Sequence, residues 1–307
     1  MIVAITGANG FIGSHLVRRF GDAGWEVREL VRRDIELGRF AERFVGADVV
    51  VHAAGATRAP TSEQLHESNV TLTATMVAAA REARVGRFVF LSSLAAVGPA
   101  ASLETPIDEA TTPAPLEAYG RTKLDAERVV VESSDLPFVI VRPAAVYGPR
   151  DRDFLSLFRL ARLGVALHAT NRDNWLSIIH VADLADAIVR SASAPEARGR
   201  IYCLGNDEPV QWGELFRLVA RCANRELKVD IEIPSFLIDA GAAVGDVVAR
   251  MTGHAGLVTT PKVTLGKARF WTCSSKLAAR ELGFVASTPL KRGLCDTYEW
   301  YREHGWL

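Results

Sequence analysis

The stretch IVAITGANGFIG, residues 2–13, decides the fold. A run of apolar and β-branched residues, Ile2–Thr6, leads directly into three glycines with the spacing Gly-x-x-Gly-x-x-Gly. In such a strand-to-helix turn, Gly7 permits a tight turn, Gly10 lets a pyrophosphate approach the backbone, and Gly13 lets the helix pack against the strand. The helix N-terminus adds free N–H groups that favour an anion. We therefore expect a dinucleotide to contact Gly7, Asn9, Gly10, Phe11, Ile12 and Gly13.

Strand and helix patterns alternate over the first two-thirds of the chain. Nearly all-apolar runs suit strands that are covered on both faces, and helical patterns lie between them. This alternation predicts an α/β fold with a doubly wound, Rossmann-like parallel sheet. The strand candidates are Ile2–Thr6, Glu26–Val31, Val49–His52, Phe88–Leu91 and Phe138–Arg142, and the helix candidates are Phe11–Gly21, Asn69–Arg84 and Leu116–Ser134.

The pattern changes after about Gly148, where loops lengthen and shorter elements follow. A strand and helix, Trp175–Val181 and Asp183–Ser193, are expected to return to the main sheet. The remainder has the pattern of a smaller, mostly helical cap. We predict a NAD(P)-binding domain of residues 1–165 plus 175–206 and a substrate-binding cap of residues 166–174 plus 207–307.

The second predicted strand ends without the acidic residue that usually binds the ribose hydroxyls of NAD. Val31 occupies the expected acidic position, and Arg32 and Arg33 follow it. An arginine at this place pairs well with a 2′-phosphate through its fork of N–H donors. The sequence therefore favours NADP over NAD. Two other interpretations stay open: the arginines are solvated surface residues, or Asp34 binds the ribose.

The connection to the third strand is short. Only Asp34–Asp48 separates the two strands, which leaves room for one helix at about Leu37–Phe44. A full doubly wound sheet would place a helix, an edge strand and another helix here. We therefore predict that the edge strand and one helix are missing, and that Asp34 and Ile35 cap the adenine directly.

Three polar residues carry the expected chemistry. Ser93 ends a strand at the sheet edge where ligands bind in open α/β folds. Tyr119 and Lys123 are four residues apart on a predicted helix and share one face. A nearby ammonium favours the phenolate, as would a positively charged nicotinamide ring, so Lys123 is expected to supply much of the shift that brings the pKa of Tyr119 from about 10 toward neutrality. Tyr119 would then be the general acid/base, Ser93 would bind the same substrate oxygen, and Lys123 would also hold the nicotinamide ribose.

Together these features resemble the extended short-chain dehydrogenase/reductases, the NAD-dependent epimerase/dehydratase family. The resemblance covers nearly the whole chain. The matching segments are TGANGFIGSHL (6–16), DVVVHAAG (48–55), NVTLTATMVAAAREARVGRFVFLSS (69–93), YGRTK (119–123), RPAAVYGPRD (142–151), IHVADLADAI (179–188), SSKLAARELGF (274–284) and WYREHGWL (300–307).

The resemblance implies further site residues and a homodimer. Asn69 is either the family's asparagine near the cofactor or a plain helix N-cap. His180 is expected to be a structural histidine. The helices that begin near Asn69 and Leu116 resemble those of the family's dimer interface. The dinucleotide cleft should also include Ala53, Ala54, Gly55, Leu91, Ser92, Pro143, Ala144 and Ala145.

The apolar stretch Ser235–Met251 resembles the branch of dihydroflavonol reductases and 3β-hydroxysteroid dehydrogenases. Many sugar-modifying members carry Thr and Tyr where this chain has Ala96 and Val97. Both features favour an oxidoreductase that transfers hydride between nicotinamide and a carbonyl or secondary alcohol. The candidate substrate residues are Thr57, Arg58, Ser93, Val97, Ala145 and Trp175, together with His168 and Trp212.

Two alternatives stay open. The first is a nucleotide-sugar epimerase or dehydratase, with Arg217, Arg269 or Arg292 on the diphosphate. The second is a dinucleotide-binding sensor or structural subunit without catalysis. The presence of Ser93 together with a Tyr-x-x-x-Lys motif argues against this second alternative.

Composition narrows the class of protein. The 36 basic and 36 acidic residues cancel, and no basic stripe suggests a nucleic-acid partner. We expect no signal peptide, no membrane partner and a small-molecule substrate. The four cysteines form no Cys-x-x-Cys pair, so we expect reduced thiols, no metal site and a cytoplasmic location.

Overall fold

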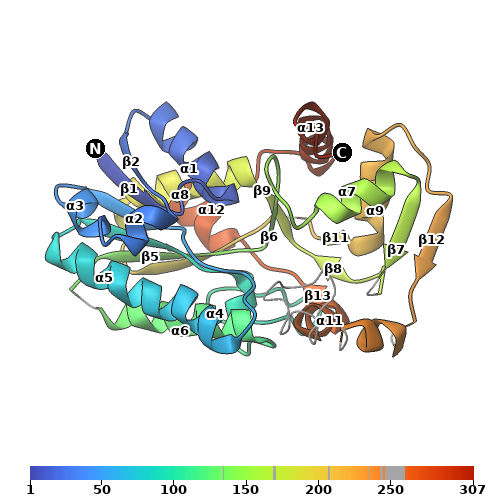
Figure 1. The fold of residues 1–307 in the computed structure, drawn as a ribbon, viewed down its shortest axis with the longest axis horizontal. Helices are drawn as coiled ribbons and strands as arrows, with labels where there is room; N and C mark the ends of the chain where they lie inside the picture. Colours follow the sequence, from blue (N-terminus) through green and yellow to red (C-terminus); the bar gives the residue numbers. More distant parts are fainter. Residues whose placement is uncertain (134, 169–170, 207, 235, 243–244, 246–259) are drawn as a thin grey trace.

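The computed structural model describes residues 1–307 except 134, 169–170, 207, 235, 243–244 and 246–259. A six-stranded sheet, parallel throughout, occupies the half of the molecule that holds the N-terminus (Figure 1). Its strands, in spatial order, are β2 (Glu26–Leu30), β1 (Ile2–Thr6), β3 (Val49–His52), β4 (Arg87–Leu91), β5 (Phe138–Pro143) and β10 (Arg200–Leu204). The predicted doubly wound α/β fold is confirmed.

Helices cover both faces of this sheet (Figure 1). Successive residues of a strand point to opposite faces, so Val3 joins one core and Ala4 joins the other. The first core packs under α1 (Phe11–Asp22), α8 (Val181–Ser193) and α12 (Lys276–Leu282), and the second under α3 (Phe40–Phe44), α5 (Leu72–Glu82) and α6 (Ala118–Glu132). The helix predicted from Asn69 begins earlier, as α4 (Ser62–His66) and the π-helical segment η1 (Glu67–Thr71).

β2 is the edge of the sheet, as predicted. The described residues 31–48 form no strand and instead contain α2 (Arg32–Glu36) and α3. The prediction of one helix over Leu37–Phe44 is wrong. Gly38 has a φ of 68° and its N–H bonds to the carbonyl of Ile35, which ends α2 and turns the chain before α3 begins.

The strand predicted over Trp175–Val181 does not join the main sheet. Ser177 donates its N–H to Trp271 (2.8 Å), and its hydroxyl accepts from the N–H of Cys273 (3.1 Å). These bonds split the run into β8 (Trp175–Leu176) and β9 (Ile178–His180). The strand that completes the main sheet next to β5 is β10, and not the predicted strand over Trp175–Val181. β8 lies between β11 (Val210–Gln211) and β13 (Phe270–Trp271), and β9 pairs with β6 (Ala145–Tyr147).

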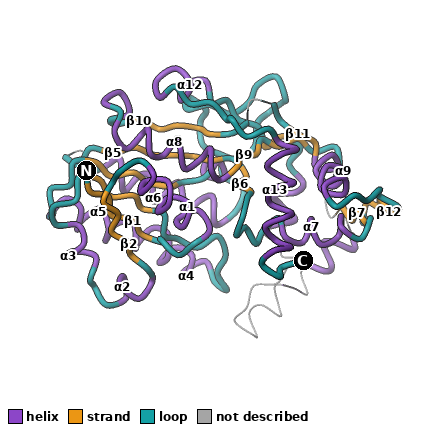
Figure 2. Tube along the Cα trace, turned by 90° about the horizontal axis from the view of Figure 1, so that it is seen from above, coloured by secondary structure: helices purple, strands orange, loops and turns teal. Residues whose placement is uncertain are grey.

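The other half of the molecule is built around a third core. Figures 1 and 2 both place β7, β12 and α9 at the end opposite the N-terminus. The predicted domain boundaries stay a prediction, and α12 packs on the main sheet although the predicted cap includes it. The elements here are α7 (Leu155–Arg162), β7 (Val165–His168), α9 (Trp212–Cys222), β12 (Val229–Glu232), α11 (Thr260–Lys267) and α13 (Leu290–Glu303), and the short helices η2 (Leu94–Ala96) and η3 (Pro195–Ala197) lie elsewhere.

Much of the apolar stretch Ser235–Met251 lies outside the described residues. The resemblance of this stretch to the reductase branch therefore stays a prediction from the sequence. Among the residues that the structure does describe, no helix combines the length and the apolar character needed to cross a bilayer.

A disulfide joins Cys222 at the end of α9 to Cys295 in α13. The expectation of four reduced cysteines is wrong for this pair, because the packing of the two helices brings their Cα atoms within 5.0 Å. Cys203 and Cys273 are buried, free thiols. The cytoplasmic location was expected because all four cysteines were expected to be reduced. The disulfide means that the cysteines no longer support that expectation.

Replacing both linked cysteines, Cys222→Ser/Cys295→Ser, should lower the free energy of unfolding. The disulfide closes a loop of 73 residues. A cross-link of that span stabilises by about 4 kcal/mol, mainly because it restricts the unfolded chain. Urea unfolding without reductant measures the difference. A reducing agent should destabilise the parent and leave the double variant unchanged; equal stability of the two proteins would contradict the prediction.

Candidate active site

The turn between β1 and α1 is shaped by its glycines. Gly7 has a φ of 71°, and a Cβ there would lie 2.9 Å from the N atom of Ala54. A Cβ at Gly13 would collide with the carbonyl of Gly7. Gly10 is the N-cap of α1, and within the described part of the chain no side chain caps it and no acidic residue occupies the first turn. Free N–H groups therefore face a backbone cradle, which fits the diphosphate of a dinucleotide.

Asn69 fixes the loop that follows β3. Its Oδ1 accepts from the N–H of Ala56 (2.9 Å), and its Nδ2 donates to the carbonyl of Ala56 (2.9 Å) and to Thr122 Oγ1 (3.0 Å). The interpretation of Asn69 as a helix N-cap is wrong, because it lies within η1 and Thr61 caps α4. π-Helical segments are frequent at functional sites. Asn69 thus ties the wall of the cleft to α6.

A buried histidine braces the same region. His52 Nδ1 lies 2.7 Å from Thr6 Oγ1, and His52 Nε2 lies 3.2 Å from Thr73 Oγ1. The Thr73 hydroxyl gives its one proton to the carbonyl of Asn69 (2.5 Å), so it accepts from Nε2, and Nδ1 accepts from Thr6. Burial lowers the pKa of His52 to about 3. The ring is therefore neutral at physiological pH and holds one tautomer.

The three predicted catalytic residues lie together. Ser93 follows β4 and caps η2, where its Oγ accepts from the N–H of Ala95 (3.2 Å). The side chains of Tyr119 and Ser93 line the same cavity, and Ser93 is near enough to the phenol to affect its pKa. Lys123 Nζ donates to the carbonyl of Leu91 (2.7 Å) and lies 4.5 Å from the ring centroid of Phe90. The end of β4 and one face of α6 thus bring these side chains to one place.

The pKa of the tyrosine shifts opposite to the expectation. Burial raises the pKa of Tyr119 to about 12, the Ser93 hydrogen bond opposes that rise, and the charge of Glu117 adds to it. The prediction of a pKa near neutrality is wrong for the chain alone, because desolvation of the phenolate is the largest effect on this pKa. Burial lowers the pKa of Lys123 to about 8, against the charge of Glu127. At neutral pH the phenol is protonated and able to donate.

Two residues that sequence reasoning missed set the position of α6. Glu117 is its N-cap, and its carboxylate accepts from the N–H groups of Tyr119 (2.5 Å) and Gly120 (2.7 Å). A Cβ at Gly120 would collide with the carbonyl of Ala95 in η2. The helix start therefore approaches the turn that carries Ser93. An acidic residue two positions before the tyrosine was the available signal for the cap.

Two cavities meet at this point. The smaller has a volume of about 290 Å³ and the larger about 570 Å³. Both are lined by Ser93, Pro143, Ala144, Ala145 and Asp153. Of the other predicted cofactor residues, the smaller cavity is lined by Phe11, Ile12, Ala53, Gly55, Leu91, Ser92, Tyr119 and Lys123.

The remaining predicted cofactor residues lie outside the cavity walls. Asn9 is exposed on the glycine turn, and Arg32 and Arg33 are exposed at the start of α2. Asp34 Oδ2 accepts from the N–H of Val31 (3.0 Å), so this carboxylate already stabilises the start of α2. The side chain of Ile35 packs against the second core.

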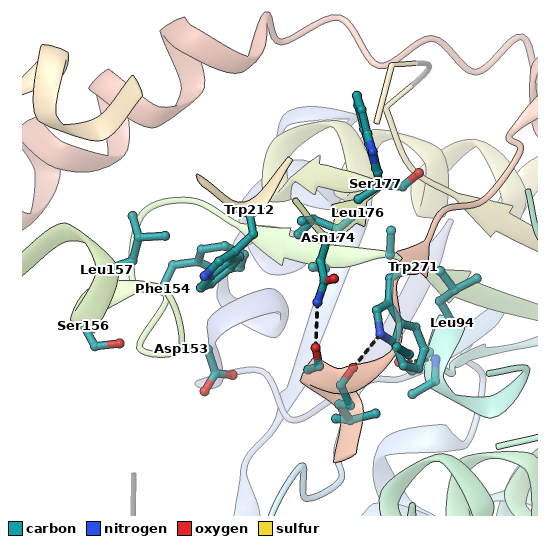
Figure 3. Close-up of a pocket in the computed structure, with 18 of the residues that line it drawn as sticks. Leu94, Asp153, Phe154, Ser156, Leu157, Asn174, Leu176, Ser177, Trp212 and Trp271 are labelled. Carbon is teal, nitrogen blue, oxygen red and sulfur yellow. Dashed lines mark hydrogen bonds between the residues drawn. The ribbon is translucent and has the colours of Figure 1, made fainter. Parts of the chain in front are cut away.

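The larger cavity is mostly apolar and aromatic (Figure 3). Trp271 Nε1 donates to the carbonyl of Leu265 (2.9 Å), and Asn174 Nδ2 donates to Gly266 (2.6 Å), so both donors are satisfied within the wall. Of the described residues that line it, Arg58 alone carries a positive charge, and Arg58 pairs with Asp153. Its aromatic residues are Phe154, Trp175, Trp212, Phe216 and Trp271.

Most of the predicted substrate residues line one of these cavities. Thr57 lines the smaller, and Arg58, Ala145, Trp175 and Trp212 line the larger. The other aromatic residues of this wall, Phe154, Phe216 and Trp271, were missed, because their sequence positions gave no sign that they converge.

Two predicted lining residues are not among the described wall residues. Val97 is 2% exposed and packs in a small core with Leu94 and Ile107. His168 turns inward, where its Nε2 lies 2.9 Å from Asp230 Oδ1. His180 caps α8 by accepting from the N–H of Ala182 (3.3 Å), in line with a structural role.

Comparisons with known proteins identify the family and agree with the fold. The sequence profile of the NAD dependent epimerase/dehydratase family matches residues 3–205. The chain is 33% identical to the ceramide reductase of Caulobacter vibrioides, over 100% of its own length and 96% of the relative's. It is 28% identical to the 4-hydroxy-2-methyl-3-oxo-4-farnesyl-3,4-dihydroquinoline-1-oxide ketoreductase of Stigmatella aurantiaca, over 94% and 93% of the two lengths. The solved structure of MoeE5 in complex with UDP-glucose and NAD shares the fold, with a TM-score of 0.80, 24% identity and 99% of each chain covered.

The substitution Gly120→Ala should destabilise the protein by about 1–3 kcal/mol, because the added methyl forces α6 away from Ala95. Urea unfolding measures the loss. The matched control is Gly21→Ala in α1, where an added Cβ meets nothing within 4 Å. That change should raise stability by about 0.5–1 kcal/mol, as expected for alanine in a helix. Equal effects at the two positions would refute the close approach.

Proposed function

This chain belongs to the NAD-dependent epimerase/dehydratase family, and on that premise we propose that it is a NAD(P)-dependent carbonyl reductase or alcohol dehydrogenase for lipophilic ketones. The observation that carries the proposal is the larger cavity. It is apolar and aromatic, it adjoins Ser93, and its one described cation is paired with Asp153. Apolar ligands gain most from such a wall. The names of both relatives denote reductases, one of ceramide and one of a farnesyl-bearing molecule.

The catalytic roles that we propose rest on the protonation states of Tyr119 and Lys123 and on the position of Ser93. Tyr119, whose pKa is raised by burial, gives its proton to the carbonyl oxygen as that oxygen gains negative charge. Ser93 hydrogen-bonds the same oxygen and so orients the carbonyl. Lys123 places a positive charge beside the phenol and stabilises the phenolate left after proton transfer. A dinucleotide held by the glycine turn and the smaller cavity would supply the hydride for the carbonyl carbon, so the products would be the alcohol and the oxidised dinucleotide.

The nucleotide-sugar alternative has less support from the larger cavity. A diphosphate needs unpaired cations, and the predicted candidates Arg217, Arg269 and Arg292 are not among the described residues of its wall. Arg217 pairs with Glu214, and Arg292 lies 3.7 Å from Asp296.

We also propose NADP as the preferred dinucleotide and a homodimer as the assembly. Arg32 and Arg33 are exposed directly after β2, beside the turn that would hold the diphosphate, and Asp34 is engaged with the N–H of Val31. The dimer is proposed through α5 and α6 by likeness to the family. Val131 on α6 is 44% exposed, which is consistent with a covered surface there.

The substitution Tyr119→Phe should lower kcat for reduction of a long-chain ketone by about 10²- to 10⁴-fold, because the proton donor is lost. The dissociation constant of the reduced dinucleotide should change little. Tyr298→Phe is the matched control, since Tyr298 lines neither cavity in the described chain. Turnover of UDP-glucose with none of the ketone would replace this proposal by the epimerase alternative, and full activity of Tyr119→Phe would remove Tyr119 from the mechanism.

The substitution Arg32→Ala should weaken NADPH binding by about tenfold, the loss of roughly one charge-assisted contact, and leave NADH binding unchanged. Fluorescence titration of both dinucleotides measures this selectivity. Arg39→Ala, which removes another exposed arginine of the same connection, is the control. If Arg32→Ala affects NADPH and NADH alike, the phosphate assignment is wrong.

A further inference from the structure

Three buried polar residues, Ser92, Glu127 and Arg142, form a hydrogen-bonded triad next to the candidate active site. Glu127 Oε1 accepts from Ser92 Oγ (2.5 Å) and from Arg142 Nε (2.9 Å), and Glu127 Oε2 accepts from Arg142 Nη2 (2.6 Å). All three residues are nearly fully buried, with Glu127 3% exposed. The triad joins the end of β4, the middle of α6 and the end of β5.

Ser92 lines the smaller cavity, and each member of the triad is close in sequence to another residue of the cavity walls. Ser92 precedes Ser93, and Arg142 precedes Pro143. Glu127 follows Lys123 by four residues, so the two side chains share one face of α6. One carboxylate is therefore connected to Ser93 through the main chain and faces Lys123 through space.

Stability alone gives little reason for such a triad. The desolvation of a buried ion pair commonly offsets its attraction, and apolar residues of similar volume are often as stable or more so. The position of the triad points to a role in the site. Ser92 is joined to Ser93 through the backbone, and the charge of Glu127 acts on Lys123.

We propose that Glu127 is a positioning residue for the proposed reductase, and this inference rests on that function. Its carboxylate anchors the strand end that carries Ser93 and supplies the negative charge that faces Lys123. Arg142 balances this charge and fixes the carboxylate in one orientation by its two-point contact.

The charges around Lys123 support this role. Burial lowers the pKa of Lys123 to about 8, and the Glu127 charge is what opposes that fall. The other ionisable groups that face Lys123 are His52 on β3, which is neutral, and Tyr119 on α6, which is protonated. Arg142 on β5 acts on Glu127. Without Glu127, less of Lys123 is charged at neutral pH.

The test compares Glu127→Gln with Glu132→Gln, the same change at an exposed position of α6. The pKa of Lys123 is read from the ¹³C resonances of the six lysines of the chain, assigned with Lys123→Arg. In Glu127→Gln it should fall by about one unit or more. The limb of the pH–kcat profile that requires the ammonium should move to lower pH by the same amount, and Glu132→Gln should match the parent. An unmoved pKa in Glu127→Gln would overturn the proposal.

Two further variants separate positioning from folding. Glu127→Asp keeps the charge but shortens the reach to Ser92, so it should preserve the Lys123 pKa and lower kcat. Glu127→Gln/Arg142→Met removes both charges without leaving an unpaired arginine, and it should still lower the Lys123 pKa if Glu127→Gln fails to fold. A double variant with the parental pKa would show a purely structural triad. The resonance titration needs no turnover, so failure to reduce ketones would refute the proposed function and leave this test intact.

Discussion

At the first turn of the chain, the carbonyl of Gly7 occupies the space that a side chain at position 13 would need. This contact lets α1 lie against β1 with its first N–H groups facing outward, where a diphosphate is stabilised. The same device recurs at Gly120, which brings α6 against the turn of Ser93. Two close backbone approaches thus place the dinucleotide cradle and the phenol of Tyr119 around one crevice at the carboxyl ends of the strands.

Burial then determines the chemistry of that crevice. The same desolvation that raises the pKa of Tyr119 lowers the pKa of Lys123, because each group loses the hydration of its charged form. The result is a protonated phenol near an amine whose lowered pKa is partly offset by the charge of Glu127. The aromatic wall of the larger cavity extends this apolar environment beyond Ser93. A low-dielectric setting strengthens each directed charge near the reacting oxygen.

Local signals predicted the sheet, the glycine turn and the Ser93, Tyr119 and Lys123 group, because strand and helix periods and short spacings are properties of neighbouring residues. Effects that depend on distant contacts were missed. The split at Ser177 depends on Trp271 and Cys273, and the Cys222–Cys295 bond spans 73 residues. The inward turn of Val97 and the rise in the pKa of Tyr119 both follow from burial, which the pattern of one segment does not reveal.

The missing outer strand leaves β2 at the rim of the sheet, where unpaired N–H and C=O groups invite pairing with another chain. Glu26 and Glu29 are exposed along this strand, and Arg28 reaches across to the carbonyls of Arg43 (3.1 Å) and Val45 (2.6 Å). Charged side chains on a five-residue edge disfavour a neighbouring strand. These charges therefore protect β2, which no outer strand covers, against edge-to-edge aggregation.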